Sequence, residues 1–243
     1  MLICYAHSDI AWFGLVPFLK NCIYRNNAKK ILEVGAGANP TLPREFINQN
    51  NLSYSLLDIS PEELAKAPPG YATIVADIGA RDMTIWDEYD FVFSRMLAEH
   101  MKSGEIFHRN IFRLLSKNGI ACHFFPTLFA PPFIVNWLMP ERLTRLFLKI
   151  IQSGRETKGK HAKFPAYYSW CCGPTALQIR RFEKIGYKIE EYVGFFGHDG
   201  YYRKQPALVK LHRKLSFNLV NRPVPWLTSF AYVVLSKFVS VAV

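Results

Sequence analysis

The chain has 243 residues, half of them hydrophobic, which is enough to bury a large α/β core without the help of disulfides. It contains five cysteines and no C-x-x-C pair. This excludes a disulfide framework or a structural zinc site as the basis of the fold, and we expect no metal site.

The net charge of +11 is concentrated in residues 142–214, which hold 16 Lys and Arg against 5 Asp and Glu. The rest of the chain is balanced. A localised positive field attracts an anionic partner, although a basic face in contact only with water gives the same pattern. The partner classes are a phosphorylated small molecule, an anionic lipid surface and a nucleic acid.

Neither end of the chain predicts a membrane span. The apolar run at residues 10–19 is short and follows no basic segment, unlike a signal peptide. Residues 226–243 are interrupted by Thr, Ser and Lys, which is unfavourable in a spanning helix. We expect a cytoplasmic protein, with peripheral contact to a membrane left open.

In chain order, the sequence predicts a leading helix over residues 9–25 and then strands that alternate with helices. Seven apolar, β-rich runs are predicted as strands: 31–35, 54–58, 73–77, 90–94, 120–125, 187–193 and 230–235. Helices are predicted around residues 107–115 and at 174–184, where Gly186 ends the second. The fold class is therefore α/β, with a Rossmann-like, doubly wound and mostly parallel sheet.

The pattern is interrupted after the fifth strand by several prolines. Residues 141–151 follow with apolar side chains at helical spacing and basic side chains between them. This basic amphipathic helix is either a lid or a membrane contact.

We interpret the chain as one domain in four parts. These are a leading helix (1–27), a cofactor-binding core (28–125), a basic cap insertion (126–173), and the last part of the sheet with a substrate-side loop (174–243).

The strongest motif is EVGAGANP at residues 33–40, a glycine-rich turn after a strand. Glycine lets the backbone approach a ligand closely, and such a turn marks a nucleotide-type site. Asp58 ends the second predicted strand and Asp77 the third. An acid at the first position can accept hydrogen bonds from ribose hydroxyls, and one at the second from an adenine amino group. Either acid alone could instead cap a helix.

These motifs resemble the class I S-adenosylmethionine-dependent methyltransferases. The family's first motif is matched by ILEVGAG at 31–37, and its second and third acids by LLDIS and VADI. Its fourth-strand region is matched by YDFVFS at 89–94 and LAEH at 97–100. The resemblance also implies an antiparallel seventh strand, which FAYVVLSK at 230–237 fits.

The resemblance implies S-adenosylmethionine as cofactor and a role for each matched residue. Glu33 and the turn glycines would meet the methionine moiety, Asp58 the ribose, and Asp77 with Ile78 the adenine. Ser94 and Met96 would line the pocket near the sulfonium. The full predicted cofactor site is Glu33, Gly35, Ala36, Gly37, Asp58, Ile59, Asp77, Ile78, Ser94 and Met96.

One departure concerns the glycine turn, where Asn39 and Pro40 stand in place of a third glycine. This puts the loop geometry in doubt but not the site. A nicotinamide dehydrogenase is the competing interpretation, but its G-x-G-x-x-G fingerprint would require glycine at position 40.

Methyl transfer needs alignment and, for some acceptors, a general base. His100 lies in the segment after the fourth strand, and His198 in an aromatic, glycine-containing loop; these two are the predicted catalytic bases. Each could equally be a packed histidine.

The sequence does not identify the acceptor. Residues 94–97 read SRML, without the turn typical of amino-directed nucleic-acid methyltransferases or the cysteine of cytosine-C5 enzymes. We favour O-methylation of a glycan, glycolipid or other small molecule. The alternatives are an RNA methyltransferase that uses the basic block and a non-catalytic, methyltransferase-like binding subunit.

Overall fold

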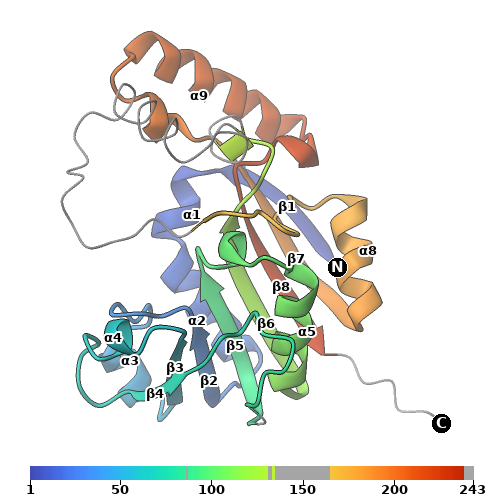
Figure 1. Ribbon diagram of the computed structural model, residues 1–243. Coiled ribbons are helices and arrows are strands. Elements are labelled where there is room, and N and C mark those ends of the chain that lie inside the picture. The colour runs from blue at the N-terminus through green and yellow to red at the C-terminus, as the bar shows by residue number, and fades with distance from the viewer. Residues whose placement is uncertain (86, 131–132, 135–164, 238–243) are drawn as a thin grey trace.

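The computed structural model describes residues 1–85, 87–130, 133–134 and 165–237. Its centre is an eight-stranded sheet with the strand order β1-β7-β8-β6-β5-β2-β3-β4 (Figure 1). The strands are β1 (Leu2–His7), β2 (Lys30–Val34), β3 (Ser53–Asp58), β4 (Ala72–Val75), β5 (Tyr89–Arg95), β6 (Leu115–Pro126), β7 (Tyr187–Phe196) and β8 (Phe230–Lys237).

The strand directions confirm the predicted sheet. All neighbouring strands are parallel except β8, which runs antiparallel to both β6 and β7. Parallel strands covered on both faces contain continuous apolar runs, which is why the inner parallel strands were recognised. In β5, residues 91–94 are all buried.

The prediction of seven strands was one short. Residues 2–7 form β1, which pairs in parallel with β7 at the edge of the sheet, with Ile3 opposite Tyr192. The first residues of β1 are exposed, so this strand lacks the fully buried run that marks the inner strands.

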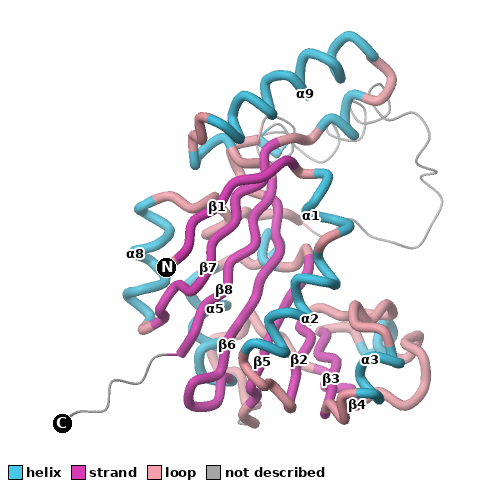
Figure 2. The backbone as a smooth tube through the Cα atoms, turned by 180° about the vertical axis from the view of Figure 1, so that it is seen from behind, coloured by secondary structure: helices cyan, strands magenta, loops and turns pink. Residues whose placement is uncertain are grey.

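Helices cover both faces of the sheet (Figure 2). α1 and α2 lie on one face, and α5 and α8 pack together on the other. The α-helices are α1 (Asp9–Phe13), α2 (Leu15–Arg25), α3 (Arg44–Gln49), α4 (Pro61–Leu64), α5 (Gly104–Leu114), α8 (Ala176–Ile185) and α9 (Pro206–Asn221). Three 3-10 helices are η1 (Ala98–His100), η2 (Asp199–Tyr202) and η3 (Pro225–Leu227).

Local sequence explains where these helices begin and end. Ser103 caps α5 and Thr175 caps α8, each through its side-chain oxygen. Gly186 ends α8 in the left-handed conformation, as predicted. The predicted leading helix is divided at Gly14 into α1 and α2.

α9 was not predicted as a helix. It follows β7 and lies over the carboxyl ends of β1 and β7, at the top of Figure 1. The predicted basic helix at 141–151 lies outside the described residues. Among the described helices, none combines the length and apolar composition needed to span a bilayer.

Candidate functional site

The glycine turn after β2 adopts the conformation that its sequence predicts. Gly35 and Gly37 have φ values of 74° and 52°, in the left-handed region that favours glycine. A Cβ atom on Gly35 would lie 2.8 Å from Leu97 Cδ1, so this position also has no room for a side chain. The backbone N–H groups of Gly35 and Ala36 donate to the carbonyl of Leu57, which fixes the turn against β3.

Glu33 holds the turn from inside the core. Its carboxylate is buried and accepts hydrogen bonds from the backbone N–H of Thr41, at 2.9 Å, and from the hydroxyls of Thr41 and Tyr54. Burial raises the pKa of Glu33, while these donors and the charge of Arg95 lower it. The carboxylate is thus largely satisfied within the protein, and its predicted contact with methionine stays a prediction.

Asp58 joins the end of β3 to the glycine turn. One carboxylate oxygen accepts from the Gly37 N–H at 2.9 Å and the other from the Ser60 N–H at 3.0 Å. Each oxygen keeps one acceptor position, which suits two ribose hydroxyls. The helix that follows is capped by Ser60, which accepts from the N–H of Glu63. Asp58 is therefore not that helix's cap.

The residues that follow β3 and β4 form the next part of the candidate site. Ile59 is 56% exposed directly after Asp58, a position suited to cover an aromatic base. Asp77 is exposed two residues beyond the end of β4 and accepts from the Gly79 N–H. The side chain of Ile78 is buried. Asn110 of α5 donates to the carbonyl groups of residues 78 and 80 and so fixes this loop.

The end of β5 forms the third side of the site. Met96 has a φ of 52°, which is costly for a residue with a side chain, and its N–H donates to the Phe124 carbonyl. Ser94 is buried and bonds His123 Nδ1 at 2.8 Å. Its side chain is therefore already engaged in the core, and the predicted pocket role of Ser94 stays a prediction.

Glu99 is a notable residue that the sequence analysis missed. It is buried in η1, and its Oε2 atom has no hydrogen-bond partner. Burial raises its pKa to about 8. Its backbone carbonyl accepts from the N–H groups of Tyr167 and Tyr168, which fixes a distant segment over η1. In the sequence, Glu99 is visible only as an acid next to His100. Its burial cannot be predicted there, because the segment that contains Tyr167 and Tyr168 is distant in the chain.

His100 lies next to Glu99 at the carboxyl edge. Its Nδ1 atom bonds the Pro165 carbonyl at 3.0 Å, and a carbonyl can only accept, so Nδ1 carries the proton. Nε2 is then the proton-accepting nitrogen, and it lies 3.8 Å from Glu99 Oε1. The imidazole side chain is 30% exposed. This tautomer and partial exposure suit a general base, and the catalytic role of His100 stays a prediction.

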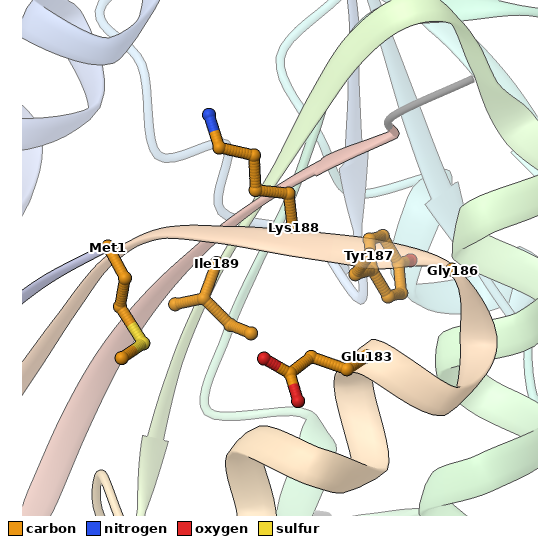
Figure 3. A pocket seen from close by; sticks show the side chains of 6 residues that line it. All are labelled: Met1, Glu183, Gly186, Tyr187, Lys188 and Ile189. Carbon is orange, nitrogen blue, oxygen red and sulfur yellow. The ribbon is translucent and has the colours of Figure 1, made fainter. Parts of the chain in front are cut away.

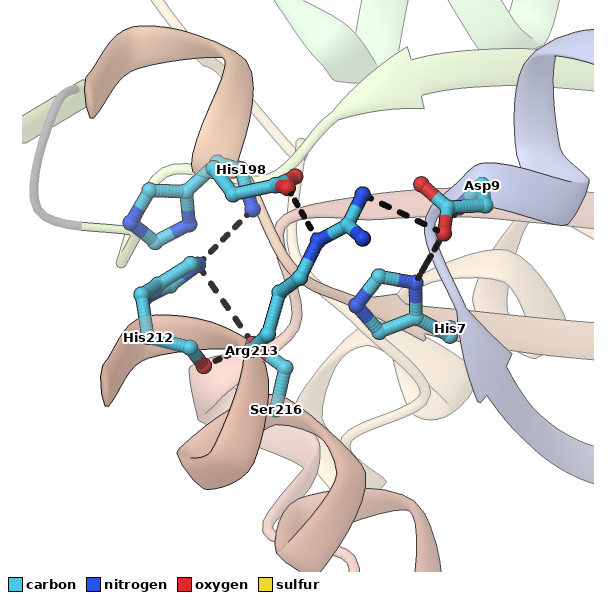
Figure 4. Close-up of polar contacts among 7 residues, drawn as sticks. His7, Asp9, His198, His212, Arg213 and Ser216 are labelled. Carbon is cyan, nitrogen blue, oxygen red and sulfur yellow. Dashed lines mark hydrogen bonds and ion pairs between the residues drawn. The ribbon is translucent and has the colours of Figure 1, made fainter. Parts of the chain in front are cut away.

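His198 has a different environment, at the end of β7 under α9 (Figure 4). Its ring nitrogens bond Ser229 Oγ and the Tyr202 hydroxyl, and its backbone N–H donates to His212 Nε2. Burial lowers its pKa to about 3, as does the neighbouring His212. Because both ring nitrogens have partners, His198 is the weaker of the two predicted bases.

A pocket of about 340 Å³ lies at the opposite edge of the sheet (Figure 3). It is lined by Met1, Glu183 and residues 186–189, where β7 begins. The glycine turn and the acids Glu33, Asp58 and Asp77 lie at or just beyond the carboxyl ends of strands. This pocket is therefore separate from the predicted cofactor site.

Within the described ranges, no group of three His, Cys, Asp or Glu side chains is placed to hold a metal ion. All five cysteines are free thiols. Cys171 and Cys172 are buried, and burial raises the pKa of both thiols.

The residues fit S-adenosylmethionine at three points. Gly35 and Gly37 have positive φ values in the turn at residues 35–37, Asp58 retains acceptor positions, and Ile59 exposes an apolar side chain beside it. With the cofactor bound, these features would supply a close backbone approach, a ribose anchor and a surface for adenine.

A family model described as a methyltransferase domain matches residues 32–123. No curated protein sequence gives a significant match. A candidate sarcosine dimethylglycine methyltransferase from Galdieria sulphuraria is 12% identical, with a TM-score of 0.55 over 93% of this chain and 86% of that one.

Two further solved structures have the same fold. An S-adenosylmethionine-dependent methyltransferase from Mesorhizobium loti is 17% identical, with a TM-score of 0.53 over 86% of this chain and 91% of that one. Phosphoethanolamine N-methyltransferase 2 from Haemonchus contortus, in complex with S-adenosyl-L-methionine, is 13% identical. Its TM-score is 0.51, over 86% of this chain and 48% of that one.

At these identities the structures establish the fold, and the domain match adds the sequence signature. The matched range contains every predicted cofactor residue and His100. Residues 32–123 thus match a methyltransferase domain in sequence, and the chain has the fold of the solved S-adenosylmethionine-dependent methyltransferases.

Proposed function

We propose that this chain is an S-adenosylmethionine-dependent methyltransferase that methylates a hydroxyl group of a glycan, glycolipid or other small molecule, with His100 as general base. The cofactor supplies a methyl group already activated by a sulfonium. What the protein must add is alignment of the acceptor and, for a hydroxyl, a group that removes its proton.

The bond between His100 Nδ1 and the Pro165 carbonyl carries this proposal. It fixes the imidazole in the tautomer whose Nε2 can accept a proton. Glu99 Oε1 lies 3.8 Å from that nitrogen and would stabilise the imidazolium once Glu99 is ionised. Both residues follow directly on the end of β5, where the predicted pocket near the sulfonium lies.

The cofactor would be held by residues at or just beyond the ends of β2, β3 and β4, the strands beyond β5 in the sheet. Asp58 would accept from the ribose hydroxyls, Ile59 and Asp77 would contact the adenine, and the turn at 35–37 would face the methionine moiety. His198 lies at the far side of the sheet, where its partners support a structural role.

Two measurements test this proposal. Calorimetry with S-adenosylmethionine and S-adenosylhomocysteine should detect micromolar binding that Asp58→Ala weakens by about tenfold or more. Transfer of a radioactive methyl group should then label a glycan or lipid fraction of a cell extract, and His100→Ala should lower this labelling at least tenfold. His198→Ala is the matched control and should retain most of the activity.

Other outcomes would redirect the proposal. Label in RNA, with binding that weakens steeply as salt rises, would favour the RNA methyltransferase alternative. Cofactor binding without any labelled acceptor would favour a non-catalytic subunit. Absence of cofactor binding by a folded protein would refute the methyltransferase activity itself.

A further inference from the structure

α9 carries an exposed apolar stripe. Leu208, Leu211 and Leu215 follow at i, i+3 and i+7 and so share one face of the helix. They are 43%, 55% and 52% exposed. Leucine at three consecutive positions of one face is the pattern of a helix that packs against an apolar surface.

The helix is attached to the rest of the protein through polar contacts instead. His212 accepts from the His198 N–H at 2.9 Å, and Arg213 donates to Asp199 at 2.6 Å (Figure 4). Ser216 is the one buried residue of α9, and the ring of Phe217 stacks on that of His7. α9 therefore contacts the rest of the protein with its polar side chains and leaves its three leucines exposed to solvent.

The charge around the stripe selects its partner. Residues 203–222 contain six Lys and Arg and no Asp or Glu. Lys210 and Lys214 are exposed on the face next to the leucines. Two positive surfaces repel each other, which disfavours a second copy of α9 as the partner.

α9 contacts β1, β7 and η2 and so covers the carboxyl ends of β1 and β7. The glycine turn, Asp58 and His100 lie at or follow the carboxyl ends of β2, β3 and β5, which are other strands of the same sheet. Exposed apolar side chains continue after the helix, at Trp226 and Leu227.

We propose that α9 docks this enzyme on an anionic membrane surface, with Leu208, Leu211 and Leu215 in the lipid interface and Lys210 and Lys214 at the phosphates. Leucines enter the boundary between headgroups and acyl chains, and lysine stems extend along it to the anionic groups. The acceptor is then a lipid-anchored molecule presented at the carboxyl edge. That last step rests on the proposed function; the docking does not.

Flotation of the full chain with vesicles tests the docking. Vesicles of phosphatidylcholine and phosphatidylglycerol in equal parts should bind the protein, and vesicles of phosphatidylcholine alone should bind it at least tenfold less. Leu211→Glu should weaken binding at least fivefold. Replacing both Lys210 and Lys214 with Ser should weaken it about fivefold per lysine.

Leu2→Glu is the matched control. Leu2 is also 55% exposed, but it lies at the opposite edge of the sheet, at the start of β1. The change has the same chemistry and charge, so binding should fall less than twofold. Thermal melting of each variant verifies that it is folded.

The other outcomes are decisive. Absence of binding to the mixed vesicles, or equal loss in Leu211→Glu and Leu2→Glu, would overturn the docking surface. A dimer in sedimentation that Leu211→Glu dissociates would assign the stripe to self-association instead. Calorimetry with S-adenosylmethionine separates the two proposals: vesicle binding without cofactor binding refutes only the proposed function, and the reverse refutes only the docking.

Discussion

Replacing Glu99 with Gln tests how much a buried carboxyl group with one unpartnered oxygen costs the fold. Burial raises the pKa of Glu99 from its usual 4.5 to about 8, so the folded state keeps a proton that the unfolded state releases. Stability from this group is therefore lost as the pH rises from about 4.5 to about 8. At about 1.4 kcal/mol per pH unit, the full loss is about 5 kcal/mol.

The Gln side chain does not titrate, so the variant lacks this loss. It buries an amide with unpaired donors, which costs about 1–3 kcal/mol at every pH. Between about pH 5 and pH 9 the wild type should therefore lose about 4 kcal/mol more unfolding free energy than the variant does. Urea unfolding of both proteins at these pH values measures it. A difference that stays constant to within about 1 kcal/mol would refute the reasoning.

Three further changes test the cofactor side. Gly35→Ala should lower the free energy of unfolding by about 1–3 kcal/mol, because its Cβ would meet Leu97 and its φ is positive; an unchanged urea midpoint would contradict this. Tyr54→Phe should cost about 1–3 kcal/mol in the same assay, because the buried Glu33 carboxylate loses a donor. Asn110→Ala should weaken S-adenosylmethionine binding about fivefold in calorimetry, because the loop after β4 loses two hydrogen bonds; equal affinity would assign Asn110 to the fold alone.

The inner strands could be predicted from the sequence because burial on both faces imposes apolar runs. The acid that ends β3 could be placed for a related reason, since the chain turns polar where the strand leaves the core. β1 escaped prediction because half of its residues are exposed and its pairing with β7 is remote in the sequence.

The chemistry of the site was harder to predict. Glu99 is distinguished by burial, and that burial depends on residues 167–168, which are nearly 70 positions away. The tautomer of His100 likewise depends on a carbonyl 65 residues along the chain. For His198, local sequence showed a loop with aromatic residues but not the partners that occupy its ring nitrogens. Such facts arise only once the sheet has brought distant segments together.

The pairing of β1 with β7 has a consequence for how this protein is made. Leu2 pairs opposite Glu191, so the two strands are translated nearly 190 residues apart. At about 5–20 residues per second, β1 waits roughly 10–40 s for its partner to leave the ribosome. Until then its apolar residues have no sheet to join, and the edge of β7, once formed, is an open template for another chain. β8 is synthesised later still, so the β1, β7 and β8 side of the sheet is completed long after β1 has been made.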